Sequence, residues 1–246
     1  MSIDRDLAGV RRIPEATVVR LPVYQRILAE LGRAGVPTVS SELLAGLARV
    51  NAAKVRKDLS LLGSFGTRGT GYDTAFLLEQ IELALGVDHD WPVVVVGIGN
   101  LGRALVNSAG FSSRGFRIAA LFDTDPAVVG QQVGPAVVRD MATLADLAAQ
   151  ERAAIGVVAT PSAAAQEVTD QLIGIGVRSI LNFAPTVLTV PAGVLLRYVD
   201  LSIELQVMSF YLTRLPAADP PGVLAPIRSV GLTPPAPGED APAGPT

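Results

Sequence analysis

The chain has 246 residues and a formal net charge of −3, and 49% of its residues are hydrophobic, so it has room for one large or two modest globular domains. The absence of cysteine excludes disulfides and thiol chemistry, and a single histidine, His89, argues against a histidine-based metal site. No apolar run approaches the length of a membrane span, and the N-terminus lacks the apolar core of a secretory signal. We therefore expect a cytoplasmic protein with no metal and no membrane partner.

Charge is distributed unevenly along the chain. Residues 1–70 hold 11 Lys and Arg against 6 Asp and Glu, whereas residues 71–246 hold 9 against 17. A basic head on an acidic body suggests that the head meets a polyanion. Solvated charges clustered by chance would give the same imbalance, so the motifs must decide between these interpretations.

Three short helices are predicted in the basic head. Apolar residues recur at helical spacing from Leu21, and Ser40 or Ser41 can cap a second helix. Asn51 can cap a third helix, which ends at Gly63. Short helices joined by tight turns are typical of a helix-turn-helix.

The third predicted helix has two unlike faces. Val55, Leu59 and Leu62 form a buried stripe, and Asp58 is the only acid between Asn51 and Gly63. The remaining polar positions are the candidate DNA contacts Lys54, Arg56, Lys57 and Ser60, which include the only two lysines of the chain. Long cations on an exposed helix can reach phosphates and guanine edges in a major groove, so we interpret this helix as a recognition helix.

A glycine-rich segment, residues 63–72, follows that helix. We expect a hairpin anchored by Phe65 and Tyr72, with Arg68 and Gly69 near its tip. Such a wing can place an arginine in an adjacent minor groove. A flexible loop with an incidental arginine is the alternative, which the neighbouring basic helix disfavours. Asp73 can then cap a helix that joins the head to the body.

Residues 93–102, Val-Val-Val-Val-Gly-Ile-Gly-Asn-Leu-Gly, combine a buried strand with a GxGxxG loop. In this motif the first glycine permits a tight turn, the second lets a pyrophosphate approach the backbone, and the third lets a helix pack closely. A second strand over 116–122 ends in Asp123, whose carboxylate would accept from a ribose 2′-OH and repel a 2′-phosphate. We therefore expect NAD+ or NADH, bound by Gly97, Ile98, Gly99, Asn100, Leu101, Gly102 and Asp123.

The remaining body alternates strands and helices. Strands are predicted over 154–159, 179–181 and 195–199, with helices over 141–150 and from a Ser162 cap to Ile173. Two loops at strand ends, Thr160-Pro161 and Asn182-Phe183, are candidate nicotinamide contacts, although each can equally be an ordinary turn.

The predicted fold is α/β, with an N-terminal winged helix-turn-helix, a Rossmann-type doubly wound parallel sheet and a C-terminal helix. The expected organisation is a DNA-binding domain over 1–73, a linker helix and hinge over 74–90, an NAD(H)-binding domain over 91–201, a dimerisation helix over 202–215 and a disordered tail over 216–246. The tail carries nine prolines among small residues and has no hydrophobic periodicity.

Taken together, these features resemble the Rex family of redox-sensing transcriptional repressors over roughly residues 12–215. The most specific stretches are residues 55–60, 66–72, the glycine loop, 122–126 and 181–185. The resemblance implies a homodimer on a pseudo-palindromic double-stranded operator, with the terminal helix exchanged between subunits. It also implies that NADH releases the DNA while NAD+ permits binding.

The resemblance further implies a switch that senses the nicotinamide. Its members would be Arg26 of the first helix, Asp200 before the terminal helix, and Leu201. Two positions depart from the family pattern: Ser108 stands where relatives often carry a tyrosine that pairs with that aspartate, and Leu201 stands where some carry a phenylalanine.

The main alternative is an NAD-dependent oxidoreductase with an appended DNA-binding domain. Reduction of a carbonyl normally needs a proton donor such as His, Lys or Tyr. The body has no lysine, His89 precedes its first strand, and Tyr198 and Tyr211 are its only tyrosines beyond the wing. We therefore expect no enzyme. A nucleotide- or CoA-binding scaffold without a DNA role would leave the basic helix unexplained.

Overall fold

The computed structural model describes residues 13–65, 71–108, 115–146 and 152–214. The chain divides into two compact units at Asp200–Leu201, so the head and the sheet domain belong to one unit and the terminal helix to another. The predicted tail and the wing residues Arg68 and Gly69 lie outside the described residues. No helix in the described segments is long and apolar enough to span a membrane.

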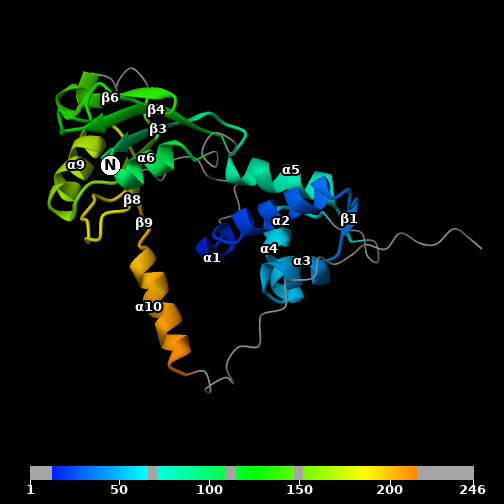
Figure 1. Ribbon diagram of the computed structural model, residues 1–246. Coiled ribbons are helices and arrows are strands. Elements are labelled where there is room, and N and C mark those ends of the chain that lie inside the picture. The colour runs from blue at the N-terminus through cyan, green and yellow to red at the C-terminus, as the bar shows by residue number, and fades with distance from the viewer. Residues whose placement is uncertain (1–12, 66–70, 109–114, 147–151, 215–246) are drawn as a thin grey trace, which may run out of the picture. The chain divides into compact units, whose positions relative to one another are not determined.

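The head is built from short helices and one small sheet (Figure 1). Its elements are α1 (Glu15–Val18), α2 (Leu21–Arg33), β1 (Thr38–Val39), α3 (Ser41–Ala48), α4 (Ala52–Leu62), β2 (Tyr72–Asp73) and α5 (Thr74–Leu85). Strands β1 and β2 pair antiparallel, which joins the end of the glycine-rich segment to the connection between α2 and α3. Neither α1 nor β1 is evident in the sequence pattern.

Side-chain caps fix where three of these helices begin. The Ser40 hydroxyl accepts from the Leu43 N–H, Asn51 Oδ1 accepts from the Lys54 N–H, and Asp73 Oδ1 accepts from the Phe76 N–H. Each cap satisfies a backbone donor that the first helical turn leaves without a partner. The predicted caps of α3, α4 and α5 are therefore confirmed.

The described residues of the body form a seven-stranded sheet in the order β5-β6-β4-β3-β7-β8-β9. Its strands are β3 (Trp91–Val96), β4 (Phe116–Asp123), β5 (Gln132–Val133), β6 (Ala136–Asp140), β7 (Ile155–Val158), β8 (Ser179–Asn182) and β9 (Leu195–Tyr198). All neighbours pair in parallel except β5 and β6. The six parallel strands have the Rossmann order, with its reversal between β3 and β7.

Helices α6 (Asn100–Val106) and α9 (Ser162–Gly174) cover opposite faces of this sheet. Val93 and Val95 pack in the cluster that contains Val106 of α6, whereas Val94 and Val96 pack in the cluster that contains Val168 of α9. All four β3 valines are buried, as expected of a parallel strand covered on both sides. The predicted doubly wound sheet is confirmed.

Three local expectations differ from the structure. Ser162 is the first residue of α9 and makes no cap, because Pro161 occupies the N-cap position and has no side-chain acceptor. The predicted 141–150 helix begins as a 3-10 turn, η1 (Met141–Thr143), and residues 147–150 lie outside the described chain. Helix α10 (Leu201–Leu212) begins one residue earlier than expected.

Candidate functional site

A cavity of about 480 Å³ opens at the carboxyl ends of β3, β4 and β7. Its lining consists of Val96, Gly97, Gly99, Asn100, Leu101, Asp123, Thr124, Asp125, Val128, Met141, Ala159, Thr160, Pro161, Ala164 and Val168. Ligands of doubly wound sheets bind beyond the carboxyl ends of the strands where the strand order reverses. Seven of the predicted cofactor residues therefore lie together at the expected place.

The three glycines of the loop have different surroundings. Gly97 has φ +92°, and a Cβ there would lie 2.6 Å from the Ala159 carbonyl oxygen. A Cβ on Gly102 would collide with the Gly97 carbonyl, so both glycines are needed for the turn and for the approach of α6. A Cβ on Gly99 would meet nothing within 4 Å, although Gly99 lines the cavity. The space in front of Gly99 is therefore free for a ligand.

Asp123 is fixed by backbone donors at the end of β4. Its Oδ2 accepts from the Ile98 N–H at 2.7 Å, and its Oδ1 accepts from the N–H groups of Thr124 and Asp125 at 2.7 and 2.9 Å. A carboxylate offers about four acceptor positions, so three contacts leave it able to accept one more hydrogen bond. The carboxylate thus joins the glycine loop to the cavity wall.

Two further features fit a nucleotide diphosphate. The Thr160 hydroxyl is buried at the cavity and has no hydrogen-bond partner among the described residues. Helix α6 starts at the cavity, and no side chain caps its N-terminus. Free N–H groups at a helix start and a buried hydroxyl are donors that a phosphate-containing ligand can satisfy.

Four predicted cofactor residues do not line the cavity. The Ile98 side chain is buried in the core, so only its N–H, through Asp123, takes part in the loop. Gly102 is a buried residue of α6 and faces the Gly97 carbonyl. The Asn182 amide is used within its own loop, donating to the carbonyls of Ala184 and Thr186, and Phe183 packs on the core. Direct contact of these four residues with the cofactor stays a prediction.

Part of the cavity lining is not evident from the sequence. Thr124, Asp125, Val128, Met141, Ala164 and Val168 were not predicted. Thr124 and Asp125 directly follow the acid at the end of β4, and this position alone could have indicated them. The others come from segments that only the fold brings to the cavity.

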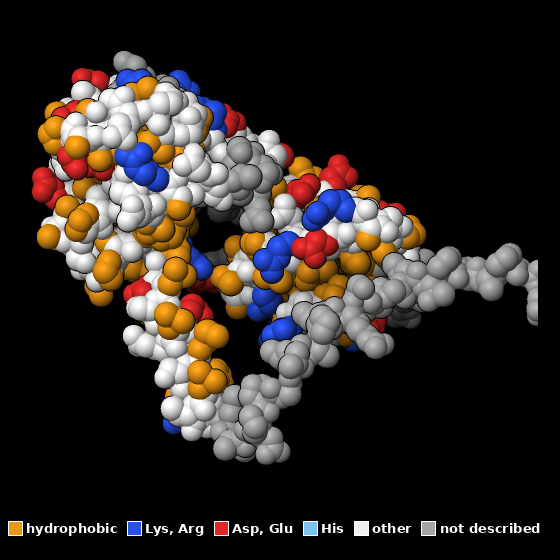
Figure 2. Space-filling view, viewed as in Figure 1, with side chains coloured by type: hydrophobic (Ala, Val, Ile, Leu, Met, Phe, Trp, Pro, Cys, Tyr) orange, Lys and Arg blue, Asp and Glu red, His pale blue; other side chains and the backbone are white. Residues whose placement is uncertain are grey.

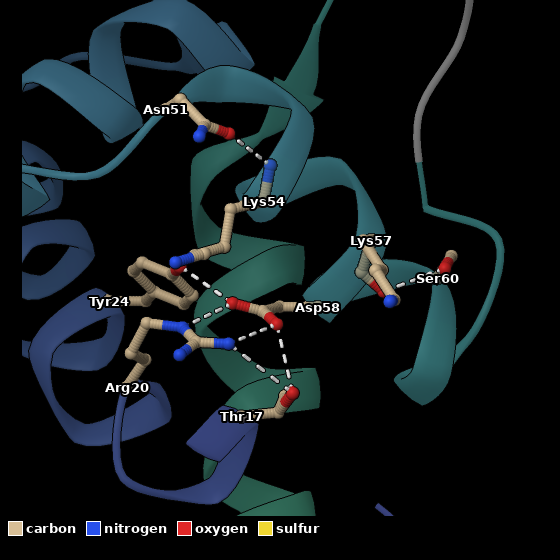
Figure 3. Close-up of polar contacts among 8 residues, drawn as sticks. All are labelled: Thr17, Arg20, Tyr24, Asn51, Lys54, Lys57, Asp58 and Ser60. Atoms are coloured by element: carbon tan, nitrogen blue, oxygen red, sulfur yellow. Dashed lines mark hydrogen bonds and ion pairs between the residues drawn. The ribbon is translucent and has the colours of Figure 1, made fainter. Parts of the chain in front are cut away.

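The exposed face of α4 carries the predicted DNA contacts. Lys54, Arg56, Lys57 and Ser60 are exposed, whereas Val55 and Leu59 are buried. Figure 3 shows Lys57 and Ser60 on the other side of α4 from Asp58. The predicted contact residues of α4 are therefore exposed, and Val55 and Leu59 of its apolar stripe are buried, as predicted.

Asp58 points into the head, where four donors surround it (Figure 3). Arg20 donates from Nε and Nη2 at 2.7 Å each, and the hydroxyls of Thr17 and Tyr24 donate at 2.9 Å. The Asp58 side chain is 2% exposed and that of Arg20 is 22% exposed. The single acid of α4, Asp58, is therefore paired inside the head and does not lie among the exposed residues of this helix.

The ionisation of this cluster follows from its contacts. Burial alone would raise the pKa of Asp58, but the hydrogen bonds from Arg20, Tyr24 and Thr17 outweigh it and hold the pKa below the ordinary value. Burial, reinforced by the hydrogen bond to Asp58, raises the pKa of Tyr24 to about 12. The cluster is thus an Arg20–Asp58 ion pair with a neutral Tyr24 at physiological pH.

The proposed switch residues lie on different elements. Arg26 is exposed on α2, Asp200 directly precedes α10, and Leu201 begins α10 with 72% of its surface exposed. Apolar side chains cover most of α10, and Figure 2 shows them along this helix. The exposed members are Leu201, Ile203, Leu205, Val207, Met208, Phe210, Tyr211 and Leu212. A helix this apolar needs a partner surface.

The described residues contain no group of three or more His, Cys, Asp or Glu side chains that could hold a metal ion.

Comparisons with known proteins bear on both parts of the chain. Residues 12–60 match the family model described as a putative DNA-binding protein N-terminus, and residues 88–186 match the CoA binding domain. The redox-sensing transcriptional repressor Rex of Streptomyces avermitilis is 59% identical over 201 residues, covering 82% of this chain and 80% of that protein. This chain belongs to the Rex family. The Rex repressor of Chloroflexus aggregans, 46% identical, matches over 82% of this chain and 95% of its own length.

Solved structures of a Rex-family repressor, RSP, have the same fold. Its complex with NAD+ and operator DNA is 34% identical, with a TM-score of 0.79 over 82% of this chain and 94% of RSP. Its complex with NADH is 33% identical, with a TM-score of 0.75 over 82% of this chain and 95% of RSP.

Proposed function

We propose that this Rex-family chain is a homodimeric transcriptional repressor that binds a pseudo-palindromic operator and senses the ratio of NADH to NAD+. In this proposal NADH binding in the cavity releases the DNA, and NAD+ permits binding. The observation that carries the proposal is the presence, in one chain, of a helix with exposed cations, α4, and a cavity of about 480 Å³ lined by the glycine loop beyond β3. The RSP complexes with NAD+, NADH and operator DNA support the same pair of ligands.

The cofactor contacts follow from the cavity. The backbone at Gly99, Asn100 and Leu101 would donate to the diphosphate, and the remaining acceptor position of Asp123 would take a ribose hydroxyl. Thr160 would contribute its unpaired hydroxyl. We propose that Asn182 and Phe183 lie near the nicotinamide without contacting it through their side chains. The Asn182 amide donates within its own loop, and Phe183 packs on the core.

The DNA contacts follow from the outer face of α4. Lys54 and Lys57 would contact phosphates or guanine edges, Arg56 and Ser60 would complete the surface, and the wing residues Arg68 and Gly69 would reach the minor groove. The four residues on α4 are exposed, which supports their part of the assignment.

For NADH to release the DNA, NADH must bind the DNA-free conformation of the protein more tightly than the DNA-bound conformation. A coupling free energy of about 1–3 kcal/mol would change DNA affinity about 5- to 150-fold. We propose that Arg26, Asp200 and Leu201 take part in this switch, and that the apolar α10 packs on the partner subunit.

We propose that the chain has no catalytic activity and acts in the cytoplasm, where its operator would be. No lysine is available beyond the head, and His89 precedes β3. Steady oxidation of NADH with simple carbonyl substrates would contradict this part of the proposal.

The decisive experiment is a gel-shift titration of DNA from upstream of the chain's own gene, with NADH and NAD+ in separate series. We expect a specific complex that NADH dissociates and NAD+ preserves. Equal effects of both dinucleotides would refute redox sensing, and the absence of any specific complex would refute the repressor function.

A further inference from the structure

Arg56 differs from the other cations of α4 because its guanidinium is hydrogen-bonded to residues of α3. Its Nη1 donates to the Glu42 carboxylate at 2.9 Å and to the Ser41 hydroxyl at 3.0 Å. Lys54 and Lys57 form no ion pair with any described residue. Within the described part of the chain, Arg56 is therefore the one cation of α4 that is already paired with an acid in the absence of DNA.

Glu42 is itself well placed to hold Arg56. It lies in the first turn of α3, and the Ser41 hydroxyl donates to its carboxylate at 3.3 Å. Its own backbone N–H, Arg56 and Ser41 keep the pKa of Glu42 below the ordinary value, so it is ionised at physiological pH. Both side chains remain accessible, since Arg56 is 55% exposed and Glu42 is 69% exposed.

The geometry of this pair leaves part of the guanidinium available. Only Nη1 contacts α3, and Nε and Nη2 have no hydrogen-bond partner among the described residues. A guanidinium can contact guanine O6 and N7 through two parallel donors. Arg56 can therefore keep Glu42 on one side while its free donors contact a base edge.

In non-specific binding, Arg56 would contact a phosphate and not a base edge. A phosphate on the same free donors would bring a second anion close to the Glu42 carboxylate, and repulsion between the two anions would offset much of the attraction to Arg56, whereas a guanine edge carries no net charge. Non-specific affinity comes from neutralising phosphates, whereas specificity comes from base edges.

We propose that Glu42 is a specificity-determining positioning residue, which directs Arg56 toward a guanine edge and withholds it from phosphates of non-operator DNA. The inference rests on the proposed contact between α4 and operator DNA. Glu42 would not touch the DNA bases and would act through Arg56 alone.

The test compares Glu42→Gln with wild type on two duplexes. One is selected from a random pool by the wild-type protein, and the other is a scrambled duplex of the same composition. Glu42→Gln keeps an acceptor for Arg56 but removes the charge, so Arg56 becomes available to phosphates. Because exposed ion pairs are weak, we expect the affinity ratio between the selected and scrambled duplexes to fall about two- to fivefold. We also expect the salt dependence for the scrambled duplex to steepen by about 0.9, which corresponds to one more phosphate contact.

Two controls separate this role from a general charge effect. Glu30→Gln makes the same charge change on α2, where Glu30 is exposed and forms no ion pair with a described residue, and it should leave the ratio at the wild-type value. In an Arg56→Ala background, Glu42→Gln should no longer change the ratio, since its effect passes through Arg56.

Each result has a definite meaning. An equal change on both duplexes, or an effect that persists without Arg56, would overturn the role of Glu42 while leaving the repressor function intact. Failure of the wild-type protein to select any duplex would instead refute operator binding itself.

Discussion

Replacement of Gly99 by valine separates folding from dinucleotide binding. A side chain at Gly99 meets no protein atom within 4 Å and projects where Gly99 lines the cavity. The substitution should therefore leave the fold intact and occupy the space of the diphosphate. Gly102→Ala, by contrast, would drive a Cβ into the Gly97 carbonyl and disrupt the loop itself.

The size of the effect follows from the donors that the valine would block. If two backbone N–H groups lose their diphosphate oxygens, and each charge-assisted hydrogen bond contributes about 1.5–3 kcal/mol, the loss is about 3–6 kcal/mol. This corresponds to about a 10²- to 10⁴-fold weaker affinity for NADH.

The measurement is a calorimetric titration with NADH, followed by a gel shift with operator DNA. We expect Gly99→Val to bind the operator as wild type does and to stay bound when NADH is added. Gly174→Val is the matched control, because a Cβ on Gly174 also meets nothing within 4 Å but lies at the end of α9, away from the cavity lining. Wild-type NADH affinity in Gly99→Val would refute the assignment of the cavity.

Other substitutions test the remaining assignments. Lys57→Ala should weaken operator binding by about 1–3 kcal/mol in a gel shift while NADH affinity is retained; a parallel loss of both would indicate misfolding. Asp123→Asn removes the charge that would repel a 2′-phosphate, so the ratio of NADPH to NADH dissociation constants should fall, and an unchanged ratio would show that the acid is misassigned. Asp58→Asn should lower the free energy of urea unfolding by about 3 kcal/mol at pH 7, the low end for a broken buried ion pair because Arg20 is partly exposed. Since the folded-state pKa of Asp58 lies below its ordinary value of 3.8, this difference should persist above about pH 4 and shrink as the pH falls through the folded-state pKa. A difference that stays constant under acid would contradict the ion pair.

Local sequence signals predicted most of the fold. The caps at Ser40, Asn51 and Asp73 and the buried valines of β3 act through neighbouring residues, so the sequence alone was sufficient to locate these elements. The glycine loop was likewise predictable, because the turn it makes requires glycine at Gly97.

Contacts between distant residues explain what the sequence did not predict. Strand β1 has only two residues and exists because it pairs with β2, 33 positions later in the register Val39–Tyr72. Nothing local indicates that Asp58 is buried and paired, because its partner Arg20 is 38 positions away. In the same way, nothing local indicates that Arg56 contacts Glu42, which lies on another helix.

The Asp123 carboxylate has two roles: it would recognise the ribose of the coenzyme, and it organises the turn after β4. Any redesign of coenzyme preference at this position would affect both roles. A cationic side chain at this position would attract the extra phosphate of NADPH. It would also leave the N–H groups of Ile98, Thr124 and Asp125 facing another donor instead of an acceptor. Converting this protein into an NADPH sensor would therefore require rebuilding the turn after β4, and a single exchange at that position would weaken the pocket for either coenzyme.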